Sequence, residues 1–175
     1  MRGGAAGLSR FRERYALALE RVVMILMIAL AAEVVLGVLM RAIGRPLVWY
    51  DEMASVLLAW LTFYGSALAS ARRAHIGCPE LVDQLAPVIR RRLAILAQIM
   101  VLAFFALLGW IGAIILPVIA DEMLVSVPWL SAATVQSVIP VSAGLILIAE
   151  ALNLIDLLRD DASQKGASSL ADGLH

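Results

Sequence analysis

Two acidic side chains lie inside long apolar stretches of this sequence, Glu33 and Glu150. An ionised carboxylate in hydrocarbon costs about 3 kcal/mol or more, so each group is expected to be paired, protonated or turned toward other helices. Glu33 shares a helical face with Ala29 and Gly37, four residues to either side, and such a small face favours close helix packing. We therefore expect Glu33 to be a buried hydrogen-bonding group.

The second acid, Glu150, falls at a depth where other polar residues are also expected. Counting the helical rise back from Arg159 places Glu150 about 14 Å into its apolar block, level with Gln98 and Ser66. We predict a polar cluster of Ser66, Gln98 and Glu150 that holds the helices in register. Proton or cation handling and contact with a partner helix are the alternative interpretations.

Residues that perform catalysis or hold a prosthetic group do not occur in suitable combinations. The chain has one cysteine, Cys78, and two histidines, His75 and His175. These exclude an internal disulfide, a thiolate metal site and a pair of haem ligands on facing helices. No nucleophile–base set and no phosphate-binding glycine loop is present. We expect no enzyme activity, no cofactor and no metal.

Two pairs of acids flank the apolar blocks, Asp51–Glu52 and Asp121–Glu122. They are expected at the outer surface, beside the ends of membrane spans. Solvated charges at helix ends are one interpretation, and an acidic rim that meets a soluble partner is the other.

The chain that positions these residues is unusually apolar. Of its 175 residues, 62% are hydrophobic and 16% are charged, whereas soluble domains are nearer half and a quarter. Four apolar blocks are each long enough to cross about 30 Å of hydrocarbon. The sequence predicts an all-α fold, an integral membrane four-helix bundle with spans at about 22–40, 53–71, 93–120 and 135–158.

The segments around the spans are expected to carry short interfacial amphipathic helices. In the N-terminal segment, residues 1–20, Phe11, Tyr15 and Leu19 recur every four residues among arginines, which is typical of a helix lying in the membrane interface. A second interfacial helix is predicted within residues 76–92. Residues 159–175, rich in small and polar residues, are expected to form a disordered cytoplasmic tail.

Basic residues orient the spans. Twelve of the fourteen Lys and Arg residues fall on one side of the predicted topology, and only Arg41 and Arg45 fall on the other. By the positive-inside rule, the N-terminus and C-terminus are both expected in the cytoplasm. The net charge of zero gives no reason to expect a nucleic-acid partner.

The second predicted span contains features of close packing. Gly65 with Ala69, and Ser66 with Ser70, form small-xxx-small pairs, which let helix backbones approach one another. Trp60 falls near the middle of the membrane in this span. It is interpreted either as a lipid-facing or core residue or as an anchor against a partner subunit.

Several stretches resemble the small membrane subunit, the Q or DctQ-like component, of tripartite ATP-independent periplasmic (TRAP) transporters. They are Trp49-Tyr50-Asp51-Glu52, then Gly65-Ser66-Ala67-Leu68-Ala69, then Arg72-Arg73-Ala74-His75-Ile76-Gly77, and finally Ile139-Pro140-Val141-Ser142-Ala143-Gly144. The resemblance covers about residues 15–160. Asp51 stands where the family more usually has Glu.

The resemblance implies a three-part secondary transport system in the bacterial inner membrane. A periplasmic substrate-binding protein captures a carboxylate, and a large multi-span membrane subunit carries it together with an ion. The small subunit, surrounded by membrane lipids, braces the static part of the large one. The candidate residues for partner contact or helix packing are Trp49, Asp51, Glu52, Trp60, Gly65, Ser66, Arg72, Arg73 and His75.

A protein of another class remains an alternative. Small proton-coupled exporters function as homodimers of four-span chains and use a single carboxylate in the first span, a position that Glu33 matches. The long basic loop after the second span and the strong orientation bias argue against this alternative.

Overall fold

The computed structural model describes residues 3–72 and 87–172, with side chains described over residues 10–72 and 89–155. The helices are α1 (Gly3–Ala42), α2 (Tyr50–Ala71), α4 (Pro87–Val118), α5 (Ala132–Gln136) and α6 (Val138–Asp172). Four helical stretches in this part of the chain are long and apolar enough to cross a membrane: Arg10–Ala42, Tyr50–Ala71, Ile89–Val118 and Ala132–Ile155. The predicted all-α fold with four spans is confirmed.

The ends of the membrane domain differ from the sequence expectation. The N-terminal interfacial helix is not separate, because α1 continues unbroken from Gly3 to Ala42. No glycine or proline interrupts the sequence between Gly7 and Gly37, so nothing local ends the helix there. At the other end α6 continues to Asp172, where a disordered tail was expected. This stretch also lacks proline.

The predicted interfacial helix at residues 76–92 lies mostly outside the described residues. Its last part belongs to α4, which begins at Pro87. Proline suits a first helical position because its missing N–H would have no partner there. The third membrane helix therefore starts before the expected residue 93.

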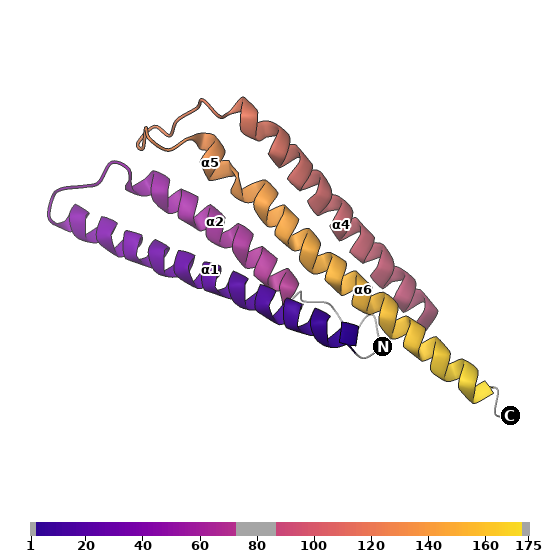
Figure 1. Cartoon of the computed structure of the whole chain (residues 1–175). Coiled ribbons are helices and arrows are strands. Elements are labelled where there is room, and N and C mark those ends of the chain that lie inside the picture. The colour runs from indigo at the N-terminus through magenta and orange to yellow at the C-terminus, as the bar shows by residue number, and fades with distance from the viewer. Residues whose placement is uncertain (1–2, 73–86, 173–175) are drawn as a thin grey trace.

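The four long helices lie in the order α1, α2, α6, α4 across the molecule (Figure 1). The Gly3 end of α1 and the Asp172 end of α6 lie toward the same end of the molecule, which we call the terminal end. The opposite end, the loop end, carries the connections 43–49 and 119–131. Which side of the membrane each end faces remains a prediction from the basic residues.

A small buried core ties three helices together near the terminal end. Its buried members are Ala16, Leu19, Ala67, Ala71, Ile146 and Ala149. Most of them are alanines, which allow the helix backbones to approach closely. At the edge of this core the Tyr15 hydroxyl donates a hydrogen bond to the Leu145 carbonyl oxygen at 2.6 Å, so α1 also reaches α6.

The break between α5 and α6 has a local cause and a tertiary support. Pro140 has no N–H to donate to the carbonyl of Gln136, and its ring crowds that carbonyl. From α2, the Trp60 indole Nε1 donates to the Val135 carbonyl oxygen at 2.9 Å. Trp60 of α2 therefore stabilises the break between α5 and α6 through this hydrogen bond.

Helices α4 and α6 pack closely where glycines of α4 face this break. A Cβ added at Gly112 would lie 3.0 Å from Ile139 Cγ2 and 3.1 Å from Pro140 Cδ. A Cβ at Gly109 would lie 3.2 Å from Ala143 Cβ. The absence of side chains at these two positions sets the distance between the helices.

We expect Gly112→Ala to destabilise the chain by about 1–2 kcal/mol relative to Gly144→Ala, because the rigid Pro140 ring must shift. Gly144 is the matched control, since a Cβ there meets nothing within 4 Å and alanine favours the helix by about 1 kcal/mol. The measurement is the midpoint of thermal unfolding in detergent. Equal midpoints for the two variants would contradict the close packing.

Candidate functional site

The largest group of polar contacts in the described chain is built around Glu150, which is 4% exposed. The Ser70 hydroxyl of α2 donates to Glu150 Oε1. The Gln98 amide of α4 donates to Glu150 Oε2 at 2.6 Å and to the Glu150 carbonyl oxygen at 3.1 Å. Residues from three helices thus meet at one carboxyl group.

Asn153, one turn further along α6, extends this polar cluster to a fourth helix. Its Nδ2 lies 3.3 Å from Glu150 Oε2 and 3.3 Å from the Ser70 carbonyl oxygen, donating to both. Its Oδ1 accepts a hydrogen bond from the Arg12 guanidinium of α1. Each carboxyl oxygen of Glu150 has at least one donor, which is what a polar group in a membrane requires.

The sequence expectation for this cluster was right for Gln98 and Glu150 and wrong for Ser66. The Ser66 hydroxyl is exposed and donates to the Thr62 carbonyl oxygen of its own helix at 2.9 Å. Ser70, one turn later, occupies the expected place and is fully buried. Ser70 was named only as the partner of Ser66 in a small-residue pair. Asn153 was missed, and its i, i+3 spacing from Glu150 is the signal that could have found it.

Glu33 lies on the face of α1 that packs against α2. Both of its carboxyl oxygens are covered, and neither has a hydrogen-bond partner in the described part of the chain. One turn further along, Gly37 is buried against the Tyr50 ring. A Cβ added at Gly37 would come within 2.1 Å of that ring. The small Glu33 face therefore packs closely, as expected, whereas the hydrogen bonds expected for Glu33 are not found in the described part of the chain. An exporter would need this carboxyl group open to water, and its covered oxygens do not favour that alternative.

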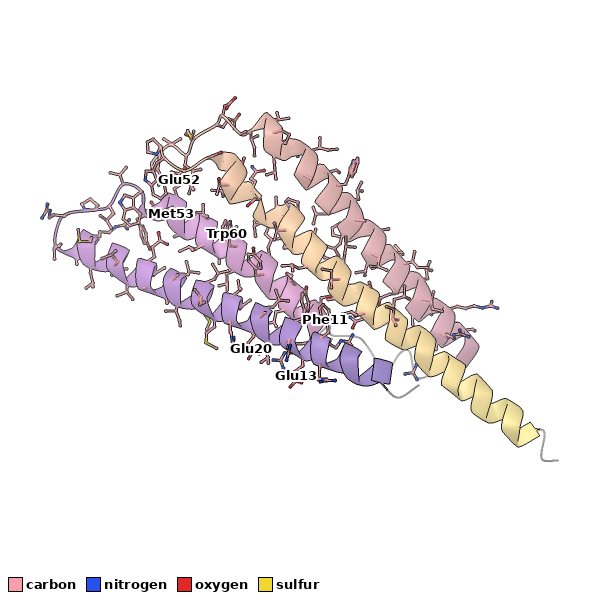
Figure 2. All side chains as sticks on the ribbon, in the orientation of Figure 1. Phe11, Glu13, Glu20, Glu52, Met53 and Trp60 are labelled. Carbon is pink, nitrogen blue, oxygen red and sulfur yellow. The ribbon has the colours of Figure 1, made fainter. Side chains whose placement is uncertain are left out.

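At the loop end, Glu52 joins the start of α2 to the connection before α5 (Figure 2). Its two carboxyl oxygens accept the backbone N–H groups of Val125 at 3.2 Å and Ser126 at 2.7 Å. A hollow of about 180 Å³ lies beside it. Its lining residues are Trp49, Met53, Ser126, Val127 and Trp129.

We expect Glu52→Ala to loosen this connection, since two N–H groups lose their charged acceptor. The expected loss of stability is about 1–2 kcal/mol, which is modest for a charged acceptor because the Glu52 side chain is only partly buried. Hydrogen exchange at the amides of residues 125 and 126 should accelerate about tenfold. Asp51→Ala is the control, because Asp51 is exposed on another face of α2. Unchanged exchange in Glu52→Ala would show that the contact does not hold the loop.

The other residues singled out from the sequence are spread over the molecule. Trp60 bonds within the chain, so its N–H is not available to a partner. Arg72 forms an ion pair with Glu20 of α1 at the terminal end, and such an exposed pair contributes about 0–1 kcal/mol. Arg73 and His75 lie outside the described residues.

Three remaining candidates, Asp51, Gly65 and Ser66, belong to an exposed face of α2. Asp51, Ser55, Leu58, Thr62 and Ser66 follow one another at helical spacing and are all exposed. A Cβ added at Gly65 meets nothing within 4 Å. The close packing predicted for Gly65 is therefore not made within the described part of the chain.

Four apolar helices joined through buried polar contacts define a multi-span membrane protein. Residues 30–160 match the family described as tripartite ATP-independent periplasmic transporters, DctQ component. This match covers most of the chain, so the chain belongs to the DctQ component family of TRAP transporters, a component of a transport system. No curated protein matches it.

Proposed function

We propose that this chain is the small membrane subunit that braces the static part of a TRAP transporter's large membrane subunit. The complete system would take up a carboxylate with a coupling ion, after delivery by a periplasmic substrate-binding protein, across the bacterial inner membrane. Family membership supports the transporter role. The exposed face of α2 supports the bracing role.

That face, which we call the α2 small-residue face, consists of Asp51, Ser55, Leu58, Thr62, Gly65, Ser66 and Ala69. Its hydroxyl groups are satisfied within α2. Ser55, Thr62 and Ser66 donate to the carbonyl oxygens four residues earlier, at 2.7, 2.8 and 2.9 Å. Leu58 is the one large side chain on this face, at 56% exposed, and Asp51 carries its one charge. The rest of the face, from Thr62 to Ala69, is thin and its hydroxyl groups are bonded, so another helix can approach it closely.

Other exposed faces of the described helices carry mostly large apolar side chains. On α1, Ile25, Ile28 and Val35 are 65%, 61% and 59% exposed, and on α4 Met100 and Phe104 are 64% and 60% exposed. Lipid tails accept such groups freely, whereas small residues gather where membrane helices pack on one another. The α2 small-residue face is the single observation that carries our assignment of the large subunit's contact.

A subunit that braces another must itself resist deformation when the other subunit moves. Polar contacts link the helices at three levels: Glu52 at the loop end, Trp60 further along α2, and the Glu150 cluster toward the terminal end. Moving one helix past another would break several of these contacts together. This arrangement suits a subunit that enlarges the fixed domain of an elevator carrier.

The loop end is the surface that we assign to the binding protein. Val125 and Trp129 are 92% and 80% exposed there, close to the hollow beside Glu52. Asp51, Asp121 and Glu122 are exposed on the same end. Screening within about 8–10 Å at physiological salt keeps the contribution of these charges small.

The test is cross-linking in native membranes that contain the whole transporter. Cysteine is placed at Ser66 in a Cys78→Ser background and coupled to a benzophenone maleimide, and Ile148→Cys on the exposed side of α6 is the control. We expect Ser66→Cys to cross-link the large subunit and Ile148→Cys to label mainly lipid. Cross-linking only from Ile148→Cys would refute the assignment of the α2 face. A transporter that assembles and transports at full rate without this chain would refute the proposed function.

A further inference from the structure

The face of α1 that points away from α2 combines exposed arginines with an apolar groove. We propose that this face binds an anionic phospholipid, with the phosphate held by Arg14 and Arg21 and the end of an acyl chain reaching the near part of the groove.

The groove is a shallow, open depression on the surface of α1 alone. Its lining residues are Ile28, Ala31, Ala32, Val35, Leu36 and Leu39. Ala31 and Ala32 form a low floor between longer aliphatic side chains, and both are exposed. The walls and floor offer only apolar contacts to an occupant.

The arginines lie in line with this groove. Arg14, Arg21, Ile28 and Val35 are spaced by seven residues, which at 100° per residue keeps them within about 60° of one another around the helix. Arg14 and Arg21 are exposed, whereas Arg12, on another side of α1, is bonded to Asn153. Two guanidinium groups on the lipid-facing line of one helix favour a phosphate, which they can bind through paired hydrogen bonds.

The distances fit one leaflet of a bilayer. Ala31 lies ten residues beyond Arg21, or about 15 Å along the helix. Half of a 30 Å hydrocarbon layer is also about 15 Å. A phosphate at Arg21 therefore brings the end of its acyl chain to the floor of the groove.

The acids nearby do not cancel this basic site. Glu20 is paired with Arg72 of α2, and Glu13 lies about 80° around the helix from Arg21; both are labelled in Figure 2. The groove also differs from the α2 small-residue face, because its rims are branched aliphatic side chains. Such rims favour a flexible acyl chain over a closely packed helix.

Native mass spectrometry of the full chain in detergent tests the proposal. The probes are phosphatidylglycerol and phosphatidylcholine with the same acyl chains. We expect about tenfold higher retention of phosphatidylglycerol, and about a tenfold loss of that retention in Arg14→Gln/Arg21→Gln, since the two guanidinium groups supply the charge that distinguishes the anionic lipid from the zwitterionic one. Arg41→Gln/Arg45→Gln removes the same charge from the loop end and should retain lipid normally.

A second variant tests the groove. Ala31→Phe/Ala32→Phe fills its floor at exposed positions and should lower the retention of both lipids. Equal retention of the two lipids by the unmodified chain, or an equal loss in both arginine double variants, would overturn the proposal. It would also be overturned if the phenylalanine variant kept its lipid and instead lost the large subunit on co-purification.

Discussion

Replacement of Gly65 by leucine is expected to reduce the co-purified large membrane subunit about tenfold or more, with substrate uptake falling in parallel. Gly65 belongs to the part of the α2 small-residue face, Thr62 to Ala69, where a partner helix would approach closely. A leucine in such a contact costs about 1–3 kcal/mol, and 1.4 kcal/mol corresponds to a factor of ten in binding. The isolated chain should unfold at an unchanged temperature, because a side chain at Gly65 meets nothing within 4 Å.

The matched control is Gly144→Leu. Gly144 also lies in a membrane helix, and a Cβ added there likewise meets nothing within 4 Å, but its neighbours on the exposed side of α6 include the large aliphatic residues Val141 and Ile148. We expect normal assembly and uptake in this variant. If both leucine variants lose the large subunit equally, or if neither does, the α2 small-residue face is not the specific contact.

Removal of the Glu150 side chain is expected to be the most destabilising change to the isolated chain. In Glu150→Ala, the donors of Ser70, Gln98 and Asn153 lose a shared acceptor in a buried site. Hydrogen bonds between membrane helices contribute about 0.6–1.7 kcal/mol each, so we expect a total loss of about 2–4 kcal/mol. Reversible unfolding in mixed micelles measures this loss, and a linked loss of assembled transporter should accompany it.

Two controls separate a structural role of Glu150 from proton handling. Glu150→Gln keeps one acceptor oxygen and removes the possible charge, so most of the stability and uptake should remain. Ser66→Ala removes a hydroxyl outside the cluster and should change stability by less than about 0.5 kcal/mol. Full loss of uptake in a stable Glu150→Gln variant would assign a proton to Glu150 during transport. A Glu150→Ala variant as stable as the unmodified chain would show that the cluster does not hold the helices.

The Glu150 cluster also shows how far sequence reasoning can reach in a membrane protein. Helical rise measured from flanking arginines placed Gln98 and Glu150 at one depth, and the structure joins them. The same calculation selected Ser66, whereas Ser70 makes the bond. Depth is set by distance along a helix, but the choice between two serines one turn apart depends on how two helices are shifted and rotated against each other.

Gly65 and Gly112 show the same limit for the prediction of helix packing from sequence. Both glycines lie in membrane helices, and the small-residue pattern singled out Gly65 for close contact. In the structure Gly112 meets Ile139 and Pro140, while Gly65 opens outward. A small residue permits a close approach, but the partner helix determines where the approach occurs.

The sequence alone determined the four spans and the all-α class, because about 20 apolar residues can satisfy their backbone in hydrocarbon only as a helix. Its motifs also determined the family. The tertiary structure decided the helix order α1, α2, α6, α4, the polar partners of Glu150 and the face of α2 left open. Sequence patterns encode these features weakly, since lipid is as apolar as a protein interior and hydrophobicity does not distinguish a face buried against a helix from one covered by lipid.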